Sequence, residues 1–186
     1  MDFNSHSALA GKHSLLSPSY YHWINYDEQK LEARLLSSQM AVRGTALHDL
    51  AHNAIQLGVK LSTNNKTMAA YVNDAIGYKM TSELALYYSD NCFGHADTLS
   101  FRRNKLRIHD LKTGITKSSV KQLEVYAAIF CLEYDVDPYE IEMEFRIYQN
   151  DVVDIFDGDP EVVASIMSTI VEFDMRIEFM KERGLQ

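Results

Sequence analysis

The chain has 186 residues, of which 46% are hydrophobic and 24% are charged. This balance is typical of a folded globular protein, and the length suffices for one domain with a substantial core. The formal net charge of −8 at pH 7 argues against a surface that attracts nucleic acid over its whole area. No apolar run is long enough to span a membrane, and residues 1–14 lack the basic-then-apolar layout of a secretory signal, so we expect an intracellular, cytoplasmic protein without a membrane partner.

Cys92 and Cys131 are the only cysteines of the sequence. Two are too few for a disulfide scaffold, and also for a four-thiolate metal or iron-sulfur site within one chain. We therefore expect two reduced thiols.

The first 80 residues have the apolar spacing of helices. Ser17 followed by a proline marks a helix start, and the irregular recurrence of apolar residues over 20–40 predicts an interrupted helix. The range 44–58 has apolar residues at helical spacing and ends at a glycine. A weaker helical pattern covers 64–76. We predict a mainly helical N-terminal part over 1–80.

The hydrophobic period changes after residue 80. Strand-like runs with short polar turns between them predict an antiparallel meander, over 83–90, 93–101 and 105–112. Helical spacing returns over 118–134, strict alternation follows over 140–149, and 151–156 is a candidate partner strand. A last helix is framed by Asp159 as N-cap, Pro160 in the first turn and Gly184 at the end.

This order of elements predicts the α/β class, with a mixed central β-sheet flanked by helices. We assign 1–186 to a single domain, with a sheet core that includes one inserted helix over 81–156 and a C-terminal helix over 159–184. The alternation of Glu140, Glu142 and Glu144 predicts the solvated face of an edge strand.

The segment 104-NKLRIHDLKTGITK-117 breaks the hydrophobic pattern. In a strand, Asp110 and Lys112 share one face with Leu106 and Ile108. Asp97 is placed in the same way in the preceding strand. Two inward carboxylates repel each other and are costly to desolvate unless a cation joins them, and oxygen ligands suit Mg2+ or Mn2+. We therefore predict a metal site for phosphodiester hydrolysis, with Lys112 orienting the attacking water.

The motifs 43-RGTALH-48, 94-GHAD-97, 110-DLK-112 and 122-QLEVY-126 occur in this order, within the range Ser17–Ile147. Together they resemble the PD-(D/E)XK nuclease superfamily, in particular the branch of the RecB nuclease domain and the Cas4-like and phage exonucleases. The resemblance implies a restriction-endonuclease-like core. It also implies metal ligands at His48, Asp97 and Asp110, a catalytic role for Asp97, Asp110 and Lys112, and a supporting or DNA-contacting role for Gln122 and Tyr126. In the mechanism that we expect, the backbone carbonyl of Leu111 is a further metal ligand.

Two departures refine the resemblance. The two cysteines cannot hold the iron-sulfur cluster of the Cas4 proteins, so no such cluster is expected and the compact phage-type exonucleases are the better comparison. The third motif has aspartate where many relatives have glutamate, which RecB-type domains accept. The resemblance thus implies an Mg2+- or Mn2+-dependent deoxyribonuclease, an exonuclease rather than an endonuclease, in DNA recombination or repair.

Expectations about partners follow from the same resemblance. The substrate is DNA, held through its backbone by basic residues that we expect to include Arg102, Arg103, Lys117 and Lys121. A recombination or replication protein and a second copy of the chain are further possible partners. If the protein is encoded by a phage, its place is the host cytoplasm.

Other interpretations of the same residues stay open. The stretch 48-HDLAH-52 is similar to a zinc-protease helix, with His48 and His52 one turn apart, but Asp49 stands where the catalytic glutamate would be. The strands argue against an all-helical HD phosphohydrolase. A catalytically inactive nuclease fold that binds DNA or a protein is a further alternative. Taken singly, His48 is more often a structural histidine, and Asp110 with Lys112 an exposed ion pair.

Overall fold

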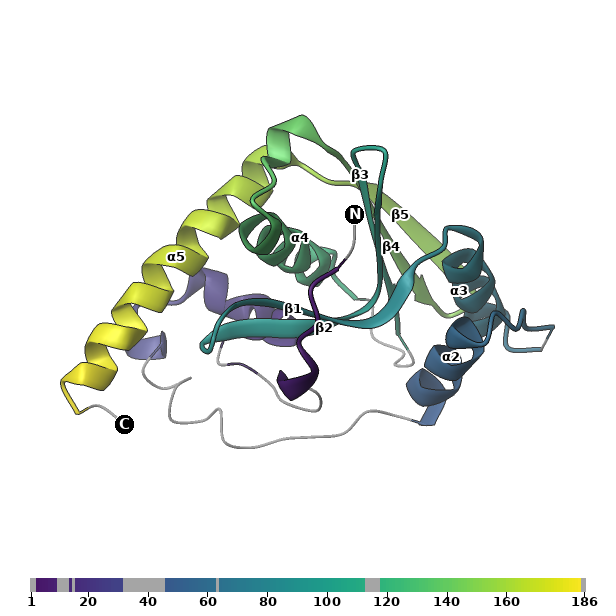
Figure 1. Cartoon of the computed structure of the whole chain (residues 1–186), viewed down its shortest axis with the longest axis horizontal. Coiled ribbons are helices and arrows are strands. Elements are labelled where there is room, and N and C mark those ends of the chain that lie inside the picture. The colour runs from purple at the N-terminus through teal and green to yellow at the C-terminus, as the bar shows by residue number, and fades with distance from the viewer. Residues whose placement is uncertain are drawn as a thin grey trace.

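The computed structural model describes residues 3–9, 14, 16–31, 46–62, 64–112 and 118–184. Its centre is a five-stranded sheet with the strand order β1-β2-β3-β4-β5. Neighbouring strands are antiparallel except β3 and β4, which are parallel. Helices cover both faces of this sheet (Figure 1). The α/β class with a mixed sheet between helices is therefore confirmed.

The bounds of the elements agree closely with the predicted ranges. The strands are β1 (Thr81–Ser89), β2 (Cys92–Arg102), β3 (Lys105–Leu111), β4 (Glu142–Gln149) and β5 (Val152–Asp157). The α-helices are α2 (Ala46–Gln56), α3 (Lys66–Gly77), α4 (Lys121–Tyr134) and α5 (Pro160–Glu182). Short 3-10 helices are η1 (Ser7–Leu9), η2 (Pro18–Asn25) and η3 (Pro138–Glu140).

The connections explain the strand directions. Arg103 and Asn104 both have positive φ in the β2–β3 turn, as do Asn150 and Asp151 between β4 and β5. Two consecutive residues of this kind form the tight turn that matches the twist of a hairpin. The helix α4 joins β3 to β4 instead, and a connection of that length allows the two strands to run parallel.

Alternation along β3 divides the core into two parts. Leu106 and Ile108 pack into the larger cluster with α4 and α5, whereas Leu111 packs into a smaller one with α2 and α3. Figure 1 shows α4 between the sheet and the long helix α5, with α2 and α3 on the other side. The helix α4 is buried over most of its length because it is covered from both sides.

Two sequence predictions need correction. The helix predicted from Ser17 begins as the 3-10 helix η2, which is kinked at Tyr20, and the Ser17 side chain makes no capping hydrogen bond. The later part of that prediction lies mostly outside the described residues. The strand β4 is internal rather than at an edge, and Glu144 is only 13% exposed because it pairs with Lys105 and two arginines.

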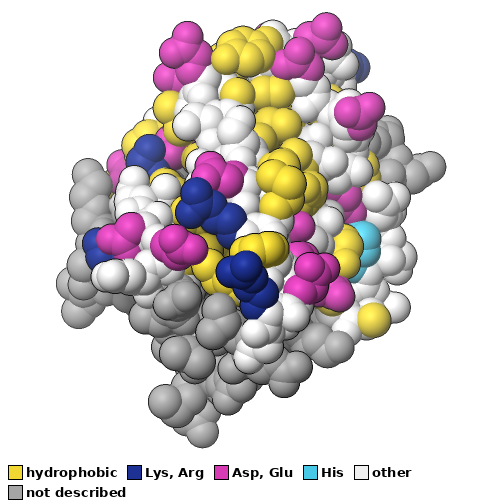
Figure 2. All heavy atoms as spheres, turned by 90° about the vertical axis from the view of Figure 1, so that its left-hand side faces the viewer, with side chains coloured by type: hydrophobic (Ala, Val, Ile, Leu, Met, Phe, Trp, Pro, Cys, Tyr) yellow, Lys and Arg dark blue, Asp and Glu magenta, His cyan; other side chains and the backbone are white. Residues whose placement is uncertain are grey.

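Among the described residues, no helix is both long and apolar enough to cross a membrane. The longest helix, α5, begins as predicted: Asp159 caps it by accepting a hydrogen bond from the N–H of Glu161 at 2.9 Å. Its outer face is visible in Figure 2, where a band of hydrophobic side chains is flanked by charged ones, both acidic and basic. Met175 and Phe179 are exposed members of this helix.

Candidate metal centre

Asp97 lies where β2 and β3 separate. The last paired residues of these strands are Thr98 and His109. Beyond that pair, a side-chain hydrogen bond replaces the backbone hydrogen bonds between the strands: Asp97 Oδ2 accepts from the N–H of Leu111 at 2.8 Å. The fork in the sheet thus fixes one carboxylate beside the end of β3.

His48 reaches the same carboxylate from the helix α2. Its Nδ1 lies 3.7 Å from Asp97 Oδ2. Burial lowers the pKa of His48, and this effect outweighs the opposing attraction of the Asp110 carboxylate. The imidazole is therefore neutral at physiological pH, which is the form that binds a metal ion.

Glu83 on β1 completes a group that the sequence did not predict. One ligand atom from each of His48, Glu83 and Asp97 lies within 4.8 Å of the others. Glu83 faces Asp97 across the hairpin, between the pairs Ser82–Thr98 and Leu84–Ala96. Its φ of 50° is rare for a residue with a side chain, and it interrupts the regular strand at this position. The Glu83 side chain is exposed, but partial desolvation by its surroundings raises its pKa, and the Asp49 carboxylate raises it further.

Asp110 and Lys112 form the second half of the centre. Lys112 Nζ lies 3.0 Å from Asp110 Oδ2 and donates a hydrogen bond of 2.9 Å to Oε1 of Gln122. Asp110 is 2% exposed, and Lys112 is partly exposed. The ammonium group is therefore held from two sides, by β3 and by α4. Asp110 is not a member of the group formed by His48, Glu83 and Asp97.

The α4 residues of the site brace one another. Gln122 Nε2 donates to the hydroxyl of Tyr126 at 3.4 Å, and the Tyr126 hydroxyl donates to the backbone carbonyl of His95 on β2. Burial raises the pKa of Tyr126, so its hydroxyl remains a donor. These contacts link the lysine to the strand that carries Asp97.

Negative charge accumulates at this site. Burial raises the pKa of Asp97 to about 6, although the Leu111 N–H and Lys112 oppose the shift. Burial and the neighbouring Asp97 carboxylate raise the pKa of Asp110 to about 7. A divalent cation would offset the free-energy cost of keeping these two buried carboxylates ionised. A neutral imidazole with carboxylate oxygens suits Mn2+, and the carboxylates also suit Mg2+. The donor set therefore fits the predicted metal.

The predicted basic residues do not all gather here. Arg102 ends β2 and Arg103 lies in the β2–β3 turn, at the end of β3 opposite to Asp110. Lys121 Nζ pairs with Glu124 at 3.0 Å. Lys117 lies outside the described residues. The Leu111 carbonyl stays a predicted ligand, since the observed contact involves its N–H.

The second histidine of the zinc alternative points to another partner. His52 Nδ1 lies 3.0 Å from the hydroxyl of Ser82. Within the described part of the chain, the group around His48 is the one set of three potential ligands, and it does not contain His52.

Comparisons with protein-family models, curated proteins and solved structures returned no match for this chain.

Proposed function

We propose that this protein is a metal-dependent deoxyribonuclease. The observation that carries the proposal is the position of Lys112, whose ammonium group is shared between Asp110 and Gln122 next to the carboxylate of Asp97 and the imidazole of His48. A lysine fixed beside buried carboxylates is suited to a reaction in which charge develops on a phosphate. The motif resemblance supports DNA as the substrate and an exonuclease as the type of enzyme.

Each side chain has a distinct part in the proposed reaction. His48, Glu83 and Asp97 would hold a Mg2+ or Mn2+ ion, with Asp110 and the Leu111 carbonyl as further ligands. The ion supplies a polarised phosphate and a water of lowered pKa. Lys112 orients that water and offsets the charge on the phosphate. Gln122 keeps the Lys112 ammonium in place, and Tyr126 ties Gln122 to β2.

The test measures release of label from end-labelled linear DNA and nicking of closed circular DNA, with Mg2+, Mn2+ or EDTA. Lys112→Ala is the informative variant, and Lys181→Ala is its matched control. Lys181 also pairs with a carboxylate at 3.0 Å, but it lies on α5. We expect Lys112→Ala to lower cleavage by about 100-fold or more, whereas Lys181→Ala cleaves as the wild type does.

The outcomes separate the proposed enzyme from its alternatives. Degradation of linear DNA alone supports an exonuclease, and the position of the label gives its polarity. Nicking of circles would instead make it an endonuclease. If no metal supports cleavage, the catalytic proposal fails, and an inactive module that binds DNA or protein takes its place.

A further inference from the structure

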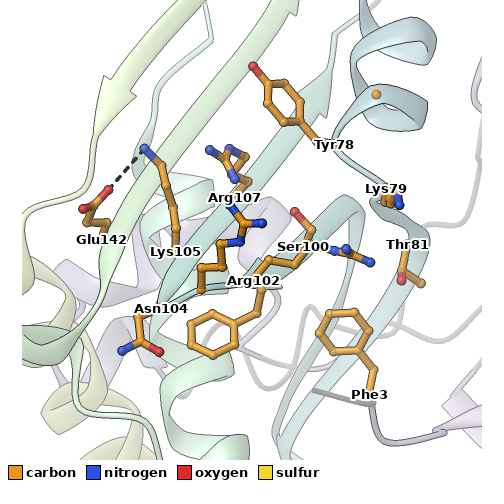
Figure 3. Close-up of a pocket in the computed structure, with 13 residues that line it drawn as sticks. Phe3, Tyr78, Lys79, Thr81, Ser100, Arg102, Asn104, Lys105, Arg107 and Glu142 are labelled. Atoms are coloured by element: carbon orange, nitrogen blue, oxygen red, sulfur yellow. Dashed lines mark ion pairs between the residues drawn. The ribbon is translucent and has the colours of Figure 1, made fainter.

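A hollow of about 1350 Å3 lies on the sheet, toward the end opposite to the Asp110 carboxylate. It is bordered by the end of α3, the residues that enter β1 and the β2–β3 hairpin. Figure 3 shows Lys105, Arg102 and Arg107 side by side in it, with Tyr78 and Phe3 at opposite borders. The cationic residues that line this hollow, called the cationic pocket below, are Lys79, Arg102, Arg103, Lys105 and Arg107.

The charge of the cationic pocket contrasts with that of the whole chain, which is −8. Glu142 is the one carboxylate among its lining residues in the described structure. Lys105 is neutralised in part, since its Nζ lies 3.5 Å from Glu142 and 3.2 Å from Glu144. Lys79, Arg102 and Arg103 form no ion pair within the described ranges. An acidic protein that gathers unpaired cations in one hollow has a site suited to an anion.

The pocket is partly organised before any ligand binds. The guanidinium of Arg107 stacks on the Tyr78 ring at 4.7 Å, and its Nε lies 3.4 Å from Glu144. Ser100, at the floor of the pocket, is 2% exposed, and its hydroxyl has no hydrogen-bond partner among the described residues. A buried polar group without a partner requires an explanation, and an anion that accepts from this hydroxyl provides one.

A second hollow lies beside the cationic pocket and includes Glu83, one residue of the candidate metal centre. It is lined by Phe3 and Thr81, which also line the pocket, and it extends along β1 to Glu83. Asp97 and Arg102 are five residues apart on β2, which corresponds to about 17 Å along the strand. That span equals roughly five nucleotides at the axial rise of about 3.4 Å per nucleotide in duplex DNA. Because Asp97 and Arg102 are an odd number of residues apart, their side chains project from opposite faces of the sheet. A strand cleaved at the metal centre must therefore follow the second hollow to reach the pocket.

We propose that the cationic pocket binds consecutive backbone phosphates of the DNA strand, about five nucleotides from the scissile bond. This inference rests on the proposed function for the identity of the strand. Guanidinium groups bind phosphate oxygens through paired hydrogen bonds, so Arg102, Arg103 and Arg107 provide the contacts. A free nucleoside triphosphate carries the same chemistry, and the experiment distinguishes the two sources.

Fluorescence anisotropy in EDTA, which prevents cleavage, tests the proposal with a labelled single strand of 12 nucleotides and a labelled duplex of 12 base pairs, both called the 12-mer below. The double variant Arg102→Glu/Arg103→Glu is compared with Arg176→Glu/Arg183→Glu on and after α5, which changes the net charge equally. We expect the first double variant to bind the 12-mer at least 10-fold more weakly than wild type, with a shallower salt dependence. We expect the control double variant to bind the 12-mer nearly as the wild type does. Ser100→Ala should weaken binding of the 12-mer several-fold without lowering the Tm of the protein.

Each remaining outcome decides against part of the proposal. Equal affinity of both double variants for the 12-mer, or no DNA binding by the wild type, overturns it. If inorganic triphosphate binds as tightly as the 12-mer and depends on Arg102 and Arg103, the ligand is a free polyphosphate and the DNA assignment is wrong. Failure of the proposed function is a separate result, seen as absence of cleavage with Mg2+ or Mn2+ while the 12-mer still binds through the pocket.

Discussion

Asp97 accepts a hydrogen bond from the Leu111 N–H across the fork between β2 and β3. This contact replaces a ladder bond at the point where the two strands separate, so it serves the sheet as well as the candidate metal centre. The same carboxylate oxygen lies 3.7 Å from His48 Nδ1. One side chain therefore joins β2 to the end of β3 by a hydrogen bond and lies beside the histidine of α2.

Asp97→Asn should separate these two roles. The amide oxygen still accepts from Leu111, so the fold is kept. Since burial raises the pKa of Asp97 to about 6, the ionised carboxylate destabilises the metal-free protein at pH 8. We expect the variant to be more stable than wild type by roughly 1–3 kcal/mol in EDTA, and to lack the rise in Tm that we expect Mn2+ to produce in the wild type. Urea unfolding in EDTA and thermal unfolding with Mn2+ measure the two effects.

A variant that is less stable in EDTA and still responds to Mn2+ contradicts this account.

Glu83 gives a second test of the metal group. Glu83→Gln removes the charge and keeps the size, so Mn2+ affinity should fall roughly 10-fold or more, as for other groups that hold a metal. Glu83→Gly should lose the same affinity but keep or gain stability, because glycine adopts the positive φ of this position without strain. Calorimetric titration with Mn2+ and urea unfolding provide the readouts. Unchanged Mn2+ affinity in both variants would remove Glu83 from the site.

The sequence predicted that Asp110 and Lys112 lie side by side at the candidate site, because strand alternation alone puts them on the face of Leu106 and Ile108. It could not predict Glu83. The register of β1 against β2 shifts between Tyr87 and Ser89, so counting residues from the hairpin turn does not place Glu83 opposite Asp97. Nor could strand patterns show that β4 joins β3 in parallel, because that pairing depends on how α4 packs.

Gly94, the first residue of the GHAD motif, has a packing reason to be glycine. A Cβ at this position would lie 2.6 Å from Cδ of Pro18 and 3.3 Å from Cε1 of Tyr126. Gly94→Ala should therefore displace η2 or Tyr126 and destabilise the protein by roughly 1–3 kcal/mol. It should also lower cleavage, since Tyr126 braces Gln122. Gly77→Ala is the control, because no heavy atom lies within 4 Å of its Cβ position. Equal urea midpoints for the two variants would refute the packing argument.

His109 makes stability depend on pH independently of the metal centre. It is fully buried between Tyr78 and Tyr148. Burial, reinforced by the positive charges of Arg146 and Arg107 and opposed by Glu144, lowers its pKa from 6.5 to about 3. The folded protein thus keeps this ring neutral where the unfolded chain protonates it.

The direction in which stability changes with pH follows from the number of protons that each state binds. Between pH 6.5 and 3 the unfolded state binds one more proton at this position, so the contribution of His109 to stability is complete above pH 6.5 and is lost as the pH falls. The loss approaches about 1.4 kcal/mol per pH unit. His109→Gln, which does not titrate, should show a flatter fall in unfolding free energy between pH 6 and pH 4 in urea titrations, whereas His22→Gln, at an exposed histidine, should follow the wild type. Parallel curves for wild type and His109→Gln would mean that other groups account for the acid sensitivity.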